Sequence, residues 1–242
     1  MFLNLKNLPL VENRQGLTFL PSGKLLINTI NAHSYNTAQQ DLLFAKALRQ
    51  GDVLIPDGAS IVKACCWLNA KSKPKERITG WDLFMFEMEK LNHSGGKCFF
   101  MGSEKVLSMI KQRSKGDFPN IEVETYSPPY KSEFNEEENN AIITAINKAN
   151  PDLLWIGMTA PKQEKWIYTH WNKLQIHCHC GTIGAVFDFY AGTVKRAPMW
   201  WQRNSLEWCY RLLKEPRRMW KRYIIGNLLF MWNMCKECKH SL

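Results

Sequence analysis

Short apolar runs alternate with longer amphipathic segments along most of this chain. The runs are rich in Val, Ile, Leu or Phe, most of them end in Gly, Asp or Asn, and they predict strands at residues 24–31, 52–56, 97–102, 121–126, 152–157 and 176–181. Continuous apolar runs of this length are typical of strands buried on both faces of a parallel sheet.

The segments between these runs have helical periodicity. They predict helices at residues 37–50, 60–70, 82–92, 104–115, 136–150 and 162–173. Asn135 followed by Glu138 forms a capping-box pattern, and Pro161 suits a first helical turn. The alternation predicts an α/β fold, a Rossmann-like open and mostly parallel sheet with helices on both faces. Ligands of such a sheet bind beyond the carboxyl ends of the strands.

The pattern changes after Gly192. Apolar and aromatic residues (Leu206, Cys209, Tyr210, Leu213, Trp220 and Ile224) fall near one helical face, and basic residues fall on a neighbouring one. Residues 195–242 hold eleven Lys/Arg against three acids, an excess of eight in a chain of net charge +10, and five of its ten tryptophans. We therefore expect an α/β core at residues 1–194 and a basic, Trp-rich helical appendage at 195–242. The appendage fits a membrane surface, although periodicity alone equally fits a helix pair docked on the core.

A basic, aromatic segment favours a polyanionic partner: an anionic membrane, a nucleic acid or a phosphorylated substrate. No apolar run approaches the roughly 18 residues that a transmembrane helix needs, so we expect peripheral membrane binding. The first 20 residues lack the pattern of a secretory signal. The eight cysteines are therefore expected to be reduced, in a cytoplasmic protein at the inner face of the cell membrane.

Polar residues gather at the predicted strand ends. They are Thr29 and Asn31, then Asp57 and Gly58, then Gly157, Lys162 and Gln163, and finally Gly184 and Asp188. Each signal is weak alone, because Asp-Gly is often only a turn and Gly-x-x-Gly often reflects packing. The glycine fingerprint of dinucleotide-binding sheets and the P-loop are both missing. Their absence argues against an NAD- or nucleotide-dependent enzyme.

Asp-x-Asp is the usual way to hold a divalent ion on a diphosphate ligand, and it does not occur in the chain. If the protein binds such a ligand, Lys/Arg side chains and helix N-termini would have to meet its charge. A zinc site built from His177, Cys178, His179 and Cys180 with Cys235 and Cys238 is disfavoured. Neighbouring side chains of a strand point to opposite faces, so at most two of the first four could reach one metal. We expect neither a metal nor a cofactor.

Several longer motifs resemble the WecG/TagA/CpsF glycosyltransferases. They begin at Pro56, Gly80, Gly157, Gly184 and Glu207, and they read PDG, GWDLF, GMTAPKQEKW, GAVFDFYAGTVKRAP and EWCYRLLKEPRR. The resemblance extends from about Lys24 to about Asn227. It implies a UDP-sugar donor, commonly UDP-N-acetylmannosamine, an undecaprenyl-diphosphate-linked acceptor sugar, inversion at the anomeric carbon, no metal and the fold called GT-E. Donors such as UDP-glucose or UDP-N-acetylmannosaminuronic acid, and formation of a homo-oligomer, stay open.

The family's functional positions correspond to Thr29, Asn31, Asp57 and Gln163, and its tail arginines are thought to complete the site. The residues of this chain that could do so are Arg196, Arg203, Arg211, Arg217 and Arg218. Inverting transfer needs one base, for which a single carboxylate such as Asp57 suffices. Arginines could stabilise the departing diphosphate. A nucleic-acid-binding protein, the remote alternative, would not need the polar set at the strand ends, so we expect no nucleic-acid partner.

Overall fold

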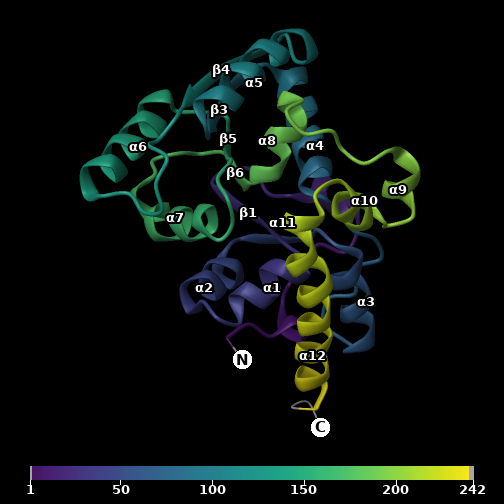
Figure 1. Ribbon diagram of the computed structural model, residues 1–242. Helices are drawn as coiled ribbons and strands as arrows, with labels where there is room; N and C mark the ends of the chain where they lie inside the picture. Colours follow the sequence, from purple (N-terminus) through teal and green to yellow (C-terminus); the bar gives the residue numbers. More distant parts are fainter. Residues whose placement is uncertain (1, 240–242) are drawn as a thin grey trace.

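The computed structural model describes residues 2–239, whose centre is a six-stranded, all-parallel sheet (Figure 1). The strand order is β2-β1-β6-β5-β3-β4. The strands are β1 (Leu25–Ile30), β2 (Val53–Pro56), β3 (Gly96–Met101), β4 (Ile121–Tyr126), β5 (Leu153–Ile156) and β6 (His179–Thr182). This confirms the predicted α/β fold. All carboxyl ends lie at one edge, where the site is expected.

Helices cover both faces of the sheet, because successive strand residues point to opposite sides. One face carries α4 (Gly80–Ser94), α5 (Glu104–Asp117) and α8 (Gly184–Ala191), packed on Ile27, Phe100 and Trp155. The other carries α1 (Ala32–Ala38), α2 (Leu42–Gln50), α3 (Ala59–Trp67), α6 (Glu136–Ala149) and α7 (Lys162–His170). Short 3₁₀ turns lie at Leu5–Asn7, Arg14–Phe19 and Trp171–Lys173.

Two predicted elements differ from the observed ones. The helix expected at 37–50 is divided, because Asp41 accepts a hydrogen bond from the Phe44 N–H and begins α2 as its N-cap. The last strand begins at His179 and not at residue 176, and the sequence pattern does not predict α8. Its strongly apolar composition hides the helical period, since apolar residues stand at exposed positions such as Ala185 as well as at the buried Val186 and Phe187.

After α8 the chain forms α9 (Met199–Arg203), α10 (Glu207–Lys214), α11 (Pro216–Trp220), a π-helical turn (Lys221–Ile225) and α12 (Gly226–Lys239). Pro216 begins α11, as expected for a break between helices. The last helix runs beside α1 (Figure 1) and buries Phe230 and Met234 in the cluster that contains Tyr35. Within residues 2–239, no helix is both long and apolar enough to cross a membrane.

Candidate active site

The site begins where β1 and β2 end side by side. Their register pairs Thr29 with Ile55 and Ile30 with Pro56, so the residues that follow, Asn31 and Asp57, are neighbours. The Asp57 N–H donates a hydrogen bond of 2.8 Å to the Ile30 carbonyl. A Cβ placed on Gly58 would lie 3.5 Å from the Asn31 Cβ. Three of the predicted site residues therefore meet at one corner of the sheet.

Asn31 has a structural role that fixes its position. Its side-chain oxygen accepts hydrogen bonds of 3.0 Å from the N–H groups of His33 and Ser34, and Ser34 closes a reciprocal capping box. The cap begins α1 directly after β1. Thr29 is half-buried on β1 next to this corner.

Asp57 lies in an environment that favours its protonated form. Burial raises its pKa to about 7, and the nearby carboxylates of Glu207 and Asp82 act in the same direction. The guanidinium groups of Arg211 and Arg77 oppose this shift. A carboxylate with a pKa near neutrality can accept a proton and then release it, as a general base must.

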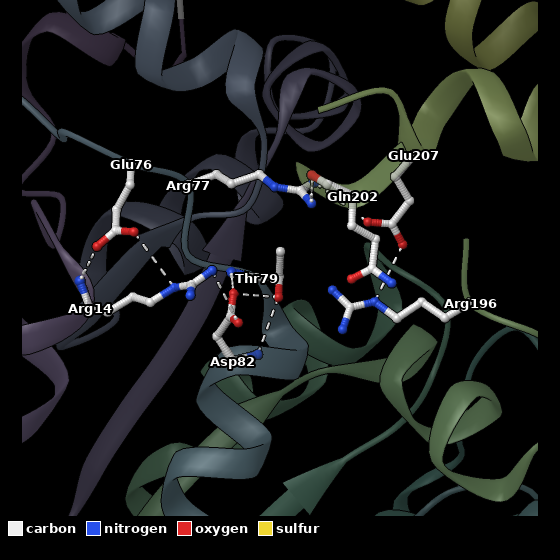
Figure 2. Close-up of polar contacts among 8 residues, drawn as sticks. All are labelled: Arg14, Glu76, Arg77, Thr79, Asp82, Arg196, Gln202 and Glu207. Atoms are coloured by element: carbon white, nitrogen blue, oxygen red, sulfur yellow. Dashed lines mark hydrogen bonds and ion pairs between the residues drawn. The ribbon is translucent and has the colours of Figure 1, made fainter. Parts of the chain in front are cut away.

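Three arginines from separate parts of the chain surround the Glu207 carboxylate. Arg77 lies 3.4 Å from it, Arg211 3.5 Å and Arg196 3.6 Å, measured between nitrogen and oxygen. Arg77 also donates to the Gln202 carbonyl at 2.9 Å, and Figure 2 shows Arg77 and Arg196 approaching Glu207 from two sides. Glu207 is buried. The arginines thus form a cationic cluster beside Asp57.

The loop before α4 brings Arg77 to this place. The Ile78 N–H donates 3.0 Å to the carbonyl of Pro56, the last residue of β2. Thr79 and Asp82 then form a capping box that begins α4, with Asp82 Oδ2 accepting from the Thr79 hydroxyl at 2.7 Å (Figure 2). Arg14 contacts the other Asp82 oxygen at 3.4 Å. Asp82 therefore caps α4, and its negative charge also helps to raise the pKa of Asp57.

Gln163 joins two loops at the neighbouring strand ends. Its side-chain oxygen accepts from the Met158 N–H at 3.1 Å and the Gly184 N–H at 3.2 Å, and its amide group donates to Glu164. Burial raises the pKa of Glu164 to about 7. A Cβ on Gly184 would lie 2.2 Å from the Met158 carbonyl oxygen, so only glycine permits this approach. The contacts support Gln163 as the group that holds both loops in place.

Several predicted residues lie outside this group. The Lys162 ammonium binds the Lys131 carbonyl at 2.6 Å and lies over the Phe134 ring, and Gly157 is packed against Phe187. Asp188 accepts from the Thr193 hydroxyl at 3.2 Å. Arg203 and Arg217 are exposed, and Arg218 forms an exposed ion pair with Glu215. Of the tail arginines that we predicted, Arg196 and Arg211 contact Glu207 in the cluster.

Three charged residues in or beside the cluster carry no sequence signal of a site. The sequence patterns do not predict Arg77 or Arg222 as site residues, and Glu207 enters them only as an acid of the C-terminal segment. The Arg222 guanidinium lies close enough to Asp57 and Arg211 for their charges to act on its pKa, which burial lowers. The GWDLF motif beginning at Gly80 could have directed attention to Arg77, three residues before it.

The sequence motif considered for zinc is used otherwise. His179 binds Glu87 through Nδ1 and the Pro21 carbonyl through Nε2, both at 2.9 Å. Cys178 and Cys180 are buried in the cluster that contains Leu26. Among the described residues, no group of three or more His, Cys, Asp or Glu side chains is placed to hold a metal ion.

In this geometry Asp57, whose pKa is near neutrality, lies beside several arginines at the edge of the sheet where the parallel strands end. A model of the glycosyl transferase WecG/TagA/CpsF family matches residues 9–241. An N-acetylglucosaminyldiphosphoundecaprenol N-acetyl-beta-D-mannosaminyltransferase of Bacillus subtilis (strain 168) is 30% identical over 200 residues, covering 82% of this chain and 75% of its own. A protein of the same name from Staphylococcus aureus (strain MW2) is 31% identical over 244 residues, covering 97% and 89%.

Proposed function

Because this chain belongs to the WecG/TagA/CpsF family of glycosyl transferases, we propose that it transfers N-acetylmannosamine from its UDP derivative to an undecaprenyl-diphosphate-linked acceptor sugar. The names of the relatives from B. subtilis and S. aureus support this donor sugar and an acceptor in which a diphosphate joins N-acetylglucosamine to undecaprenol. The observation that carries the proposal is the juxtaposition of Asp57 with an arginine cluster at the ends of β1 and β2.

In the proposed reaction Asp57 removes the proton of an acceptor hydroxyl. That oxygen forms a bond to the anomeric carbon of the donor while the bond from this carbon to the UDP oxygen breaks. Inversion follows from this single displacement. UDP leaves with an additional negative charge, which Arg77, Arg196 and Arg211 stabilise from positions already fixed before the reaction.

The acceptor is lipid-linked, so the enzyme is proposed to work at the inner surface of the cell membrane. Exposed apolar side chains of the C-terminal segment support this placement: Met199, Trp200, Leu213, Leu228, Met231 and Trp232. Lysines and arginines flank them in sequence. Apolar side chains beside basic ones are what binding to an anionic interface requires.

A panel of UDP-sugars assayed with a short-chain polyprenyl-diphosphate N-acetylglucosamine tests the proposal. We expect release of UDP with UDP-N-acetylmannosamine at least ~10-fold faster than with UDP-glucose, a ratio within the range that pocket contacts supply. Transfer should continue in excess EDTA, because arginines replace a divalent ion on the diphosphate. Faster release of UDP with UDP-glucose or UDP-N-acetylmannosaminuronic acid would show that the proposed donor sugar is wrong. Release of no UDP from any donor would overturn glycosyl transfer itself.

A further inference from the structure

Glu207 is unusual among the acids of the site because its environment is cationic on several sides. It belongs to α10, whereas Arg77 precedes α4 and Arg196 lies between α8 and α9. Arg211 is one helical turn further along α10. A single carboxylate therefore links the loop before α4 to two segments of the C-terminal part of the chain. An anion in this position prevents three guanidinium groups from repelling one another.

Each of these arginines is held from a second side as well. Arg77 donates to the Gln202 carbonyl, the Arg196 guanidinium lies 5.4 Å from the centre of the Trp81 ring, and that of Arg211 lies 4.8 Å from the centre of the Phe189 ring. Two contacts fix the direction of a long side chain much better than one, and arginines ordered before binding lose less entropy on meeting an anion.

The charge of the cluster matches the ligand that the proposed function requires. Three guanidinium groups against one carboxylate leave an excess of two positive charges. The diphosphate of a UDP-sugar carries two negative charges, and its departure as UDP adds a third. Without Glu207, the three guanidinium groups would repel one another and would be less ordered before the donor binds.

From this geometry we infer that Glu207 is a positioning residue, which holds Arg77, Arg196 and Arg211 in the arrangement that receives the donor diphosphate. This inference rests on the proposed function. Glu207 keeps its carboxylate buried and bound to the arginines throughout, and the acceptor proton goes to Asp57.

The negative charge of Glu207 also raises the pKa of Asp57 through space, so the role of Glu207 can be tested in the pH dependence of the rate. Charged groups face Asp57 from four parts of the chain. They are Glu207 and Arg211 of α10, Arg77 of the loop before α4, Asp82 of α4 and Arg222 of the π-helical turn. Burial is the largest influence on the pKa of Asp57, and the charge of Glu207 is the next. Removing this charge should lower that pKa, so the acidic limb of the pH–rate profile should move to lower pH.

The test compares two full-length variants, Glu207→Gln and Glu207→Asp, across pH 5–9 with the wild type. For Glu207→Gln we expect kcat about 10–100-fold lower on the plateau, the range for misplaced groups, and an acidic limb about 0.5–1 pH unit lower. For Glu207→Asp, which keeps the charge on a shorter side chain, the plateau should fall while the limb stays. Glu124→Gln, which replaces a partly exposed acid paired with Lys97, should behave as wild type.

A merely structural role would lower the plateau of Glu207→Gln and leave its limb unmoved, which overturns the inference. A wild-type plateau in Glu207→Asp overturns it as well, and this variant decides the matter if Glu207→Gln does not fold. The wild-type assay is the reference for both variants. If wild type transfers no sugar, the proposed function has failed; if wild type is active and the variants do not show these changes, only the role of Glu207 has failed.

Discussion

At the scale of single residues, Asp57 lies at the end of a strand and has a pKa of about 7. Position could be predicted from sequence, because Asn31, Asp57 and Gly58 directly follow apolar runs and parallel strands end at one edge. The proton affinity could not, because it depends on burial and on Glu207 and Asp82, which are distant in sequence. The Arg77–Glu207 contact spans 130 residues and leaves no local pattern.

Replacement of this carboxylate gives the prediction that belongs to the residue scale. Asp57→Asn should lower kcat at least ~10²-fold, because an amide cannot accept the acceptor proton. In the wild type, activity should fall as the pH drops below about 7, where Asp57 becomes protonated. A pH–rate profile measures both, with Asp117→Asn, an exposed partner of Arg113, as the control. Near-wild-type turnover of Asp57→Asn would exclude it as the base.

At the scale of elements, the amphipathic helices and buried strands of residues 24–173 follow from local pattern and caps. The C-terminal segment follows less well, because α12 has apolar residues on two sides. Phe230 and Met234 pack inward with Asn233 and Glu237, whereas Leu228, Met231 and Trp232 remain exposed. Periodicity cannot tell which side meets the core. The division at residues 194 and 195 stays a prediction, but deleting 195–242 would remove part of the cluster around Tyr35.

The two sides of α12 should respond differently to truncation of a side chain. Phe230 packs edge-on against Tyr35, with ring centres 5.4 Å apart, so Phe230→Ala should cost about 3–5 kcal/mol in the free energy of unfolding. Trp232 is 60% exposed, and Trp232→Ala should cost less than about 1 kcal/mol. Urea denaturation followed by circular dichroism measures the difference. Equal unfolding midpoints for the two variants would mean that α12 does not stabilise the core.

At the scale of the whole molecule, charge and exposed apolar groups concentrate in the last fifth of the chain, where the sequence already shows an excess of basic residues and tryptophans. The full-length protein should bind vesicles that contain anionic lipid and release them as NaCl rises from about 0.05 to about 0.5 M, because salt screens surface charges. Joint replacement of the exposed Met231 and Trp232 by Gln should weaken binding at every salt concentration. Tyr130→Gln, on a distant exposed loop, is the control in the same sedimentation assay. Binding that salt does not affect would contradict the electrostatic contribution.

The contact between α12 and the start of the chain also has a consequence for synthesis. Glu237 accepts hydrogen bonds from the Lys6 N–H at 2.6 Å and from the Tyr35 hydroxyl at 2.7 Å, and α12 runs beside α1 (Figure 1). A growing chain folds from its N-terminus, and here Leu3, Leu5 and Tyr35 share an apolar cluster with Phe230 and Met234 of α12. In a nascent chain this cluster therefore stays incomplete, with part of its apolar surface uncovered, until α12 has been synthesised.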